Sequence, residues 1–187
     1  MGRYPLLRRC FEEAPVVDKN GYDYFVNPIS DGVPRVDPDV LEEAVDGLVS
    51  EASFDCDLIL APEAMGIPLA AGISLKARIP FSVVRKKRYG LPGEMELTQR
   101  TGYSKAAMFL NGLEKGTRVA IVDDVLDTGG TVFAVASAAR DAGAVVTKVA
   151  VVYAMSDVQA FSKKVGAPVV ALLSVGVEGG RPFVRSA

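Results

Sequence analysis

Short apolar runs recur along the chain, and most are followed by a polar loop and then by a helix-like segment. The runs lie at 57–61, 81–84, 118–123, 145–153 and 169–174. Because they lack an alternating polar face, they predict strands buried on both sides, as in parallel sheets covered by helices. Apolar spacing and capping residues predict helices at about 40–50, 69–77, 131–142 and 158–164. The chain is therefore expected to be α/β, with a mainly parallel sheet of about five strands centred on 118–123 and flanked by helices.

Polar residues gather directly after the central predicted strand. They are two adjacent carboxylates, a third carboxylate, and a loop of hydroxyls and glycines: Asp123, Asp124, Asp127, Thr128, Gly129, Gly130 and Thr131. The helix that follows would direct unpaired N–H groups and its positive dipole end at this loop, which suits a phosphate. The glycines allow close approach of the backbone, and the hydroxyls add donors. The neighbouring carboxylates favour hydroxyl groups or a cation, so the pattern indicates a sugar phosphate.

The run 119–131 resembles the diphosphoribosyl-binding motif of type I phosphoribosyltransferases, which has four apolar residues, two acidic residues and a loop ending Thr-Gly-Gly-Thr. The resemblance implies that 127–131 bind the 5′-phosphate of 5-phosphoribosyl 1-diphosphate (PRPP). It implies that Asp123 and Asp124 hold ribose hydroxyls or waters on a Mg²⁺ ion that the substrate itself coordinates, with no direct protein ligand to the metal. Asp127 is also a candidate proton acceptor near N7 of the purine. Neither a Walker sequence nor a dinucleotide fingerprint occurs in the chain.

A second loop follows strand 57–61. By the same resemblance, its residues Glu63, Ala64, Met65 and Gly66 bind diphosphate through backbone N–H groups, often with an unusual peptide geometry. As a sequence, this loop also fits a plain strand-to-helix turn punctuated by Pro62 and Gly66.

Residues 86–104 are rich in Gly and Pro and only weakly periodic, which predicts a long flexible loop. The loop opens beside four consecutive cations, 85–88. Such a run is often a solvated surface, but beside two phosphate loops it can reach diphosphate while the loop closes and excludes water. Arg85, Lys86 and Lys105 are the candidates for this contact.

Residues 1–36 precede the main fold and are expected to form a small hood. A short aromatic strand at 21–26 is typical of packing, but in adenine-type phosphoribosyltransferases a similar segment covers the base. By that resemblance Tyr24, Phe25 and Val26 are candidates for stacking on the base. The tail after 175 either closes one side of the base pocket or covers the sheet edge.

Composition narrows the chemistry further. The chain has 187 residues, enough for one domain with a substantial core, and a net charge of −2, which indicates neither a nucleic-acid nor a membrane partner. No apolar run approaches the ~20 residues that span a bilayer, and the expected location is cytoplasmic. The two cysteines form no disulfide framework. The absence of histidine excludes every mechanism that needs a Ser-His or Cys-His pair.

The resemblance covers most of the chain, read as a single domain over 1–187, and is nearest to archaeal hypoxanthine/guanine phosphoribosyltransferases and their adenine relatives. It implies purine salvage: transfer of phosphoribosyl from PRPP to hypoxanthine or guanine, with Mg²⁺ as cofactor and a homodimer as the assembly. Adenine is the alternative base, although the Glu that precedes Tyr-Gly-Lys in adenine enzymes is replaced by Gly102. A member of another class, a non-catalytic regulator that senses PRPP, is the second alternative.

Overall fold

The computed structural model describes residues 3–19, 21–100 and 105–185. In chain order the elements are α1 (Pro5–Glu12), β1 (Val16–Asp18), β2 (Asp23–Phe25), α2 (Pro28–Asp31), α3 (Pro38–Ala52), β3 (Leu58–Pro62), α4 (Gly66–Ala77), β4 (Phe81–Val84), β5 (Met95–Arg100), β6 (Lys105–Leu110), β7 (Arg118–Leu126), α5 (Gly130–Asp141), β8 (Val145–Ala154), α6 (Val158–Val165), β9 (Val169–Glu178) and β10 (Arg181–Val184). Among the described residues, no helix is long and apolar enough to cross a membrane.

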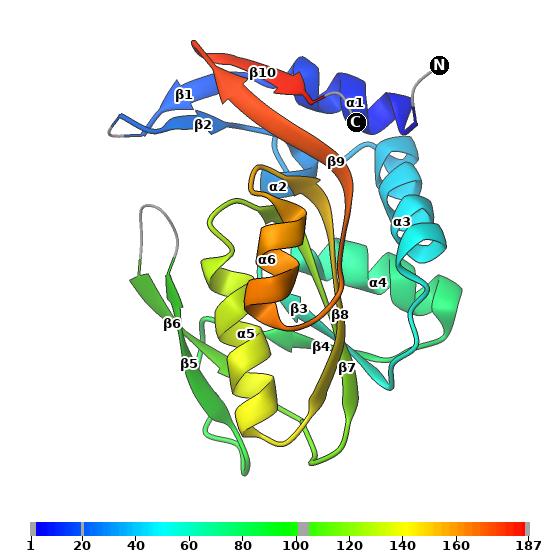
Figure 1. Ribbon diagram of the computed structural model, residues 1–187, viewed down its shortest axis with the longest axis vertical. Helices are drawn as coiled ribbons and strands as arrows, with labels where there is room; N and C mark the ends of the chain where they lie inside the picture. The colour runs from blue at the N-terminus through cyan, green and yellow to red at the C-terminus, as the bar shows by residue number, and fades with distance from the viewer. Residues whose placement is uncertain (1–2, 20, 101–104, 186–187) are drawn as a thin grey trace.

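The main sheet has the order β10-β9-β8-β7-β3-β4 (Figure 1). The pairs from β9 to β4 are parallel, so the five parallel strands predicted from the apolar runs are confirmed, with β7 in the middle. The structure adds a sixth strand, β10, which runs antiparallel along the edge of β9. The tail therefore covers the sheet edge, which is one of its two expected roles. Apolar periodicity missed β10 because an edge strand of four residues needs little apolar surface.

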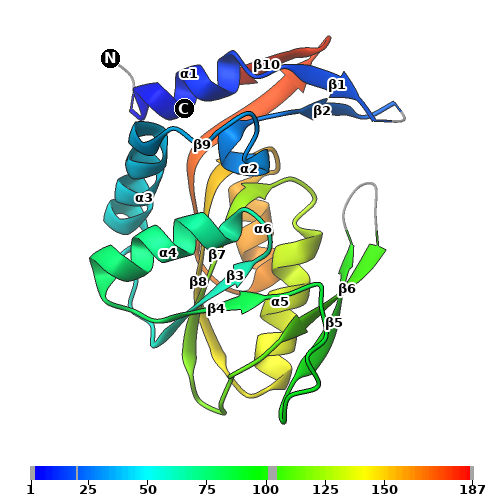
Figure 2. The same cartoon turned by 180° about the vertical axis from the view of Figure 1, so that it is seen from behind.

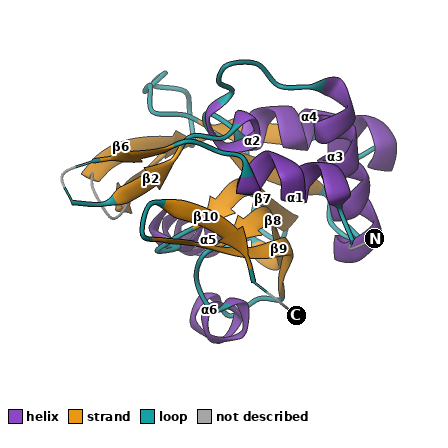
Figure 3. Ribbon diagram, turned by 90° about the horizontal axis from the view of Figure 1, so that it is seen from above, coloured by secondary structure: helices purple, strands orange, loops and turns teal. Residues whose placement is uncertain are grey.

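Both faces of the sheet are covered, as Figures 2 and 3 show. Successive residues of β3 alternate between two apolar cores: Ile59 and Ala61 join the core beneath α3 and α4, whereas Leu60 joins the core beneath α5 and α6. Both cores exclude water from the strands, which explains why β3 is apolar throughout and β7 is apolar over 119–122. Asp37 and Asp157 cap α3 and α6 by accepting backbone N–H bonds of the first turn. The sequence predicted the cap at Asp157 and left Asp37 and Asp39 as alternatives for the other helix, where Asp37 is the cap.

The segment 86–104 differs from the expected loop. Its second half contains β5, which pairs antiparallel with β6 to form a separate hairpin beside α5. Leu97 and Met108 anchor this hairpin in the core beneath α5. The weak periodicity misled the prediction because a two-stranded hairpin buries only one of its faces. Flexibility of 86–94 remains a prediction. Gly102, which replaces the Glu of adenine enzymes, lies outside the described residues.

The hood is built from α1, the β1–β2 ribbon and α2, and it sits above the carboxyl ends of the main strands (Figure 1). Its core is aromatic: the ring of Phe11 lies 4.8 Å from that of Phe25 and 5.1 Å from that of Tyr153 on β8. Asn27 is fully buried and donates to the Cys10 carbonyl at 3.0 Å, which ties α2 to α1. The hood is therefore fastened to the sheet rather than hinged on a linker.

Candidate functional site

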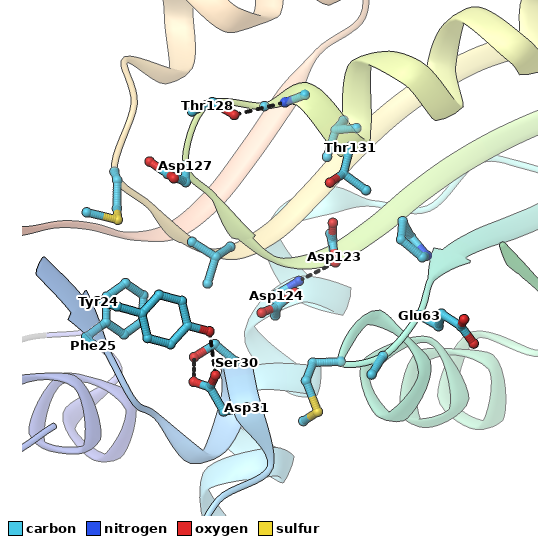
Figure 4. Close-up of a pocket in the computed structure, with 18 of the residues that line it drawn as sticks. Tyr24, Phe25, Ser30, Asp31, Glu63, Asp123, Asp124, Asp127, Thr128 and Thr131 are labelled. Atoms are coloured by element: carbon cyan, nitrogen blue, oxygen red, sulfur yellow. Dashed lines mark hydrogen bonds between the residues drawn. The ribbon is translucent and has the colours of Figure 1, made fainter. Parts of the chain in front are cut away.

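A cleft of about 380 Å³ lies between the hood and the carboxyl ends of β3 and β7. This position agrees with the rule that open parallel sheets bind ligands beyond the carboxyl ends of their strands. Three groups of residues line it, from the hood, from the loop after β3, and from the end of β7 with the loop that follows (Figure 4). Segments far apart in the sequence thus face one space.

The loop after β7 forms one wall of the cleft. All five residues predicted for the phosphate line it, from Asp127 to Thr131, and α5 begins within them at Gly130. Gly129 has φ +72°, and a Cβ on it would lie 2.1 Å from the Phe161 ring, so only glycine fits. The Thr128 hydroxyl accepts from the Gly130 N–H at 3.4 Å. The first turn of α5 therefore borders the cleft, and a helix N-terminus in that position suits an anion.

Asp123 and Asp124 lie inside β7 rather than at its end, because the strand continues to Leu126. The prediction that the strand stops at the acidic pair was wrong: Val125 and Leu126 extend the pairing with β8 at Tyr153 and Ala154. Both carboxylates still line the cleft. Consecutive strand residues point to opposite faces, so the two groups approach a ligand from different sides.

Burial governs the electrostatics of this pair. Asp123 is only 7% exposed, and its Oδ1 accepts from the Asp124 N–H at 3.1 Å. Burial raises the pKa of Asp123, and burial together with the neighbouring Asp123 charge raises the pKa of Asp124 well above its ordinary value. The pair is thus poised to hold hydroxyl groups or a cation, either of which would stabilise its charged form.

The loop after β3 forms the opposite wall. Glu63, Ala64 and Met65 line the cleft, and the Glu63–Ala64 peptide is cis, the unusual geometry implied by the family resemblance. Gly66 begins α4 rather than lining the cleft, and a Cβ there would lie 2.8 Å from the Val122 carbonyl oxygen of β7. The glycine therefore lets the first turn of α4 sit directly against the strand that carries the acidic pair.

The three predicted cations behave differently from one another. Lys86 lines the cleft, and its N–H donates to Glu63 Oε1 at 2.6 Å. Arg85 does not line the cleft; its Nε lies 3.0 Å from Glu63 Oε2, an ion pair whose N–H is not aligned as a hydrogen bond. Lys105 begins β6, and its side chain lies outside the described part of the chain. Of the two cations whose side chains are described, Lys86 lines the cleft and Arg85 does not.

The hood supplies residues that the sequence pattern predicted only in part. Tyr24 and Phe25 line the cleft, whereas Val26 is not among the lining residues and its N–H donates to the Pro15 carbonyl at 2.8 Å. Seven lining residues were missed: Tyr22, Ser30, Asp31, Pro62, Val125, Val132 and Met155. The Asn27-Pro28 pair is a helix-start signal, with Asn as the N-cap residue and Pro at the first helical position. That signal marks α2 but gives no indication that its last residues face a ligand.

The Tyr22 hydroxyl connects the hood to the phosphate loop, because it donates to Asp127 Oδ2 at 2.9 Å. Its partner is one of the carboxylates that the sequence singled out. No local pattern reveals this bond, since 105 positions separate the two residues.

A parallel sheet with a glycine loop for phosphate, an adjacent acidic pair and a hood over the same cleft defines the type I phosphoribosyltransferase fold. The chain belongs to the phosphoribosyltransferase family: the model of the phosphoribosyl transferase domain matches residues 39–172.

Relatives and solved structures agree with this assignment. A hypoxanthine/guanine phosphoribosyltransferase of Methanohalobium evestigatum is 42% identical over 92% of this chain and 90% of its own length. HGPRTase-like protein 2 of Haloterrigena turkmenica is 51% identical over 78% of this chain and 81% of its own. The adenine phosphoribosyltransferase of Thermoanaerobacter pseudethanolicus superposes with a TM-score of 0.72 at 22% identity, covering 90% of this chain and 99% of that one. The last likeness shows the shared fold.

Proposed function

We propose that this chain is a purine-salvage enzyme that transfers the phosphoribosyl group of PRPP to hypoxanthine or guanine, releasing diphosphate and IMP or GMP. The observation that carries the proposal is the convergence of the acidic pair, the phosphate loop and the hood aromatics on one cleft. The archaeal relatives named hypoxanthine/guanine phosphoribosyltransferase support the choice of base.

Different residues of the cleft bind different parts of the substrate. The N–H groups and hydroxyls of 127–131 hold the 5′-phosphate, and Asp123 and Asp124 hold the ribose hydroxyls. The backbone of 63–65 and the Lys86 ammonium face the diphosphate from the other wall. Departure of diphosphate builds positive charge on the sugar, so correct orientation and exclusion of water matter more than a covalent intermediate. Asp127 is the proposed proton acceptor near N7 of the purine, held by Tyr22.

Mg²⁺ would bind here through oxygen atoms of the substrate rather than directly through protein side chains. Within the described ranges, no group of three or more His, Cys, Asp or Glu side chains is arranged to hold a metal ion. Asp123 and Asp124, whose charged forms burial disfavours, would instead hold waters or ribose hydroxyls around an ion that the substrate coordinates. The chemistry that Mg²⁺ supplies when bound is neutralisation of charge on the leaving diphosphate.

The function is tested by turnover with separated purines, comparing wild type with Asp124→Asn. We expect formation of IMP and GMP by the wild type and a loss of at least about 100-fold in the variant, the scale of removing a charge-positioning group. Circular dichroism should show both proteins folded. Near-normal turnover by the variant would remove Asp124 from the proposed machinery.

Two other outcomes decide between the alternatives. Formation of AMP in preference to IMP and GMP would make this an adenine enzyme, the activity named for the structural neighbours. Binding of PRPP without turnover of any purine would make it a PRPP sensor. A homodimer in the cytoplasm, proposed from the family resemblance, is tested separately by light scattering and by cell fractionation.

A further inference from the structure

Asp31, at the end of α2, is a half-buried carboxylate that lines the hood side of the cleft and has no role in the mechanism above. Three donors converge on it. The Tyr24 hydroxyl donates to Oδ1 at 2.5 Å, the Ser30 hydroxyl to Oδ2 at 2.7 Å, and the Asn27 N–H to Oδ2 at 2.9 Å (Figure 4). The carboxylate is therefore fixed in position before any ligand enters.

These bonds also determine whether this part of the hood offers hydrogen-bond donors or acceptors to a ligand. A hydroxyl has one proton, so Tyr24 and Ser30 cannot donate to a ligand while they donate to Asp31. A carboxylate has about four acceptor positions, of which three are used here, so Oδ1 can accept another bond. This side of the cleft consequently offers acceptors and attracts the N–H groups of a ligand.

Purine bases differ in what they present to such a surface. Hypoxanthine carries an N1–H donor, guanine carries N1–H and a 2-amino group side by side, and adenine carries an unprotonated N1 that is an acceptor. A carboxylate facing that edge stabilises guanine most and hypoxanthine next. It opposes adenine, because two lone pairs would face each other.

We propose that Asp31 is the residue that selects 6-oxopurines, by accepting the N1–H of hypoxanthine or guanine and the 2-amino group of guanine. This inference rests on the proposed function, because it assigns the edge of the base to the hood side of the same cleft. The apolar wall needed beside a base is present, since Phe25, Val125 and Met155 line the cleft with Tyr24.

A purely structural role for Asp31 makes a different prediction. The bond from the Asn27 N–H resembles a capping interaction at the start of α2, and the loss of a cap weakens the hood for every substrate alike. Base recognition changes the ratio between substrates instead. The ratio of kcat/KM for guanine to that for adenine is therefore the informative quantity.

The experiment measures kcat/KM for guanine, hypoxanthine and adenine, and KM for PRPP, in wild type and in Asp31→Asn. The amide keeps the size of the side chain but turns an acceptor into a donor suited to N1 of adenine. We expect the guanine-to-adenine ratio to fall roughly 10- to 100-fold, the range of a hydrogen bond to a charged group, with KM for PRPP unchanged. The matched control is Asp23→Asn, because Asp23 is an exposed hood carboxylate that does not line the cleft.

The possible outcomes distinguish the role of Asp31 from the proposed function. An equal loss for all three bases, or a rise in KM for PRPP alone, would overturn the role of Asp31 while leaving the proposed function intact. If Asp31→Asn does not fold, the wild-type ratios decide, because adenine used as well as guanine would refute selection by Asp31. Failure of the wild type to use any purine would refute the proposed function itself.

Discussion

Two of the three parts that line the cleft, the phosphate loop (127–131) and the hood, meet at the Tyr22–Asp127 bond and are built in opposite ways. The phosphate loop is contiguous, and residues 127–131 take their places through the end of β7 and the first turn of α5. The hood is assembled from α1, β2 and α2 through side-chain bonds, such as Asn27 to Cys10 and Tyr24 to Asp31. One wall is a local motif and the other is a product of tertiary packing.

This difference assigns a different task to each wall. A local motif can hold a group that every substrate of the family shares, and the 5′-phosphate is such a group. Under the proposed function the hood distinguishes bases that differ at one edge, which requires donors and acceptors brought together from separate segments. Changes in the loop should therefore abolish activity, whereas changes in the hood should redirect or weaken it.

Among changes in these two walls, the largest effect should come from Gly129→Ala in the loop. The new Cβ meets both a positive φ and the Phe161 ring, so it must displace the loop that is proposed to hold the phosphate. We expect kcat/KM for PRPP to fall roughly 100-fold. The free energy of unfolding should fall by about 1–3 kcal/mol beyond the cost of the positive φ.

Gly112→Ala is the matched control, because Gly112 also has φ +72° but nothing lies within 4 Å of its Cβ position. It should lose about 1 kcal/mol of stability, the cost of placing a side chain in the left-handed region, with kcat/KM retained. Equal losses of activity in the two variants would show that the packing of Gly129 has no special part in phosphate binding.

The acidic pair between the two walls should make the stability of the ligand-free protein depend on pH. Because the folded pKa values of Asp123 and Asp124 are raised, the folded state holds more protons than the unfolded state above pH ~4. The contribution of the protonated pair to the free energy of unfolding is complete below that pH and is lost as pH rises through the folded pKa values. Each unit of raised pKa corresponds to about 1.4 kcal/mol.

Urea denaturation between pH 4 and pH 8 measures this slope, and Asp124→Asn should flatten it because one of the two titrations is removed. A slope that is unchanged in the variant would show that the pair is ionised at no cost in the folded protein.

The smallest effect should come from Tyr22→Phe, which cuts the bond between the walls. Loss of a hydrogen bond to a carboxylate costs about 1–2 kcal/mol, so kcat/KM should fall roughly 10-fold with the base preference retained. Tyr153→Phe is the control. The Tyr153 hydroxyl is buried, donates to the Leu7 carbonyl at 3.2 Å and does not line the cleft. That variant should lower stability and leave kcat/KM unchanged, and a loss confined to Tyr153→Phe would contradict the assignment of Tyr22.

The same contrast explains what could be predicted from the sequence. The phosphate loop, the acidic pair and the buried strands were predicted because each depends on neighbours in the chain. Asp31 and Tyr22 were missed because their importance depends on what packs against them. Arg85 was predicted to face the ligand, but its charge is already matched by Glu63, which follows the neighbouring strand β3.

The end of β7 and the presence of β5 were predicted wrongly for a related reason. β7 continues past its acidic pair because β8 offers further backbone partners, and those partners are invisible in the pattern of β7 alone. β5 was missed because Leu97 is its one fully anchored apolar side chain among the described positions.

The antiparallel strand β10 has a consequence for the hood. It packs against α1, so the first helix of the described chain rests on the last strand (Figure 1). α1 is also held by α3 and, through Phe11 and Tyr153, by β8. A change in β10 is therefore expected to reach the hood through α1, although no residue of β10 lines the cleft.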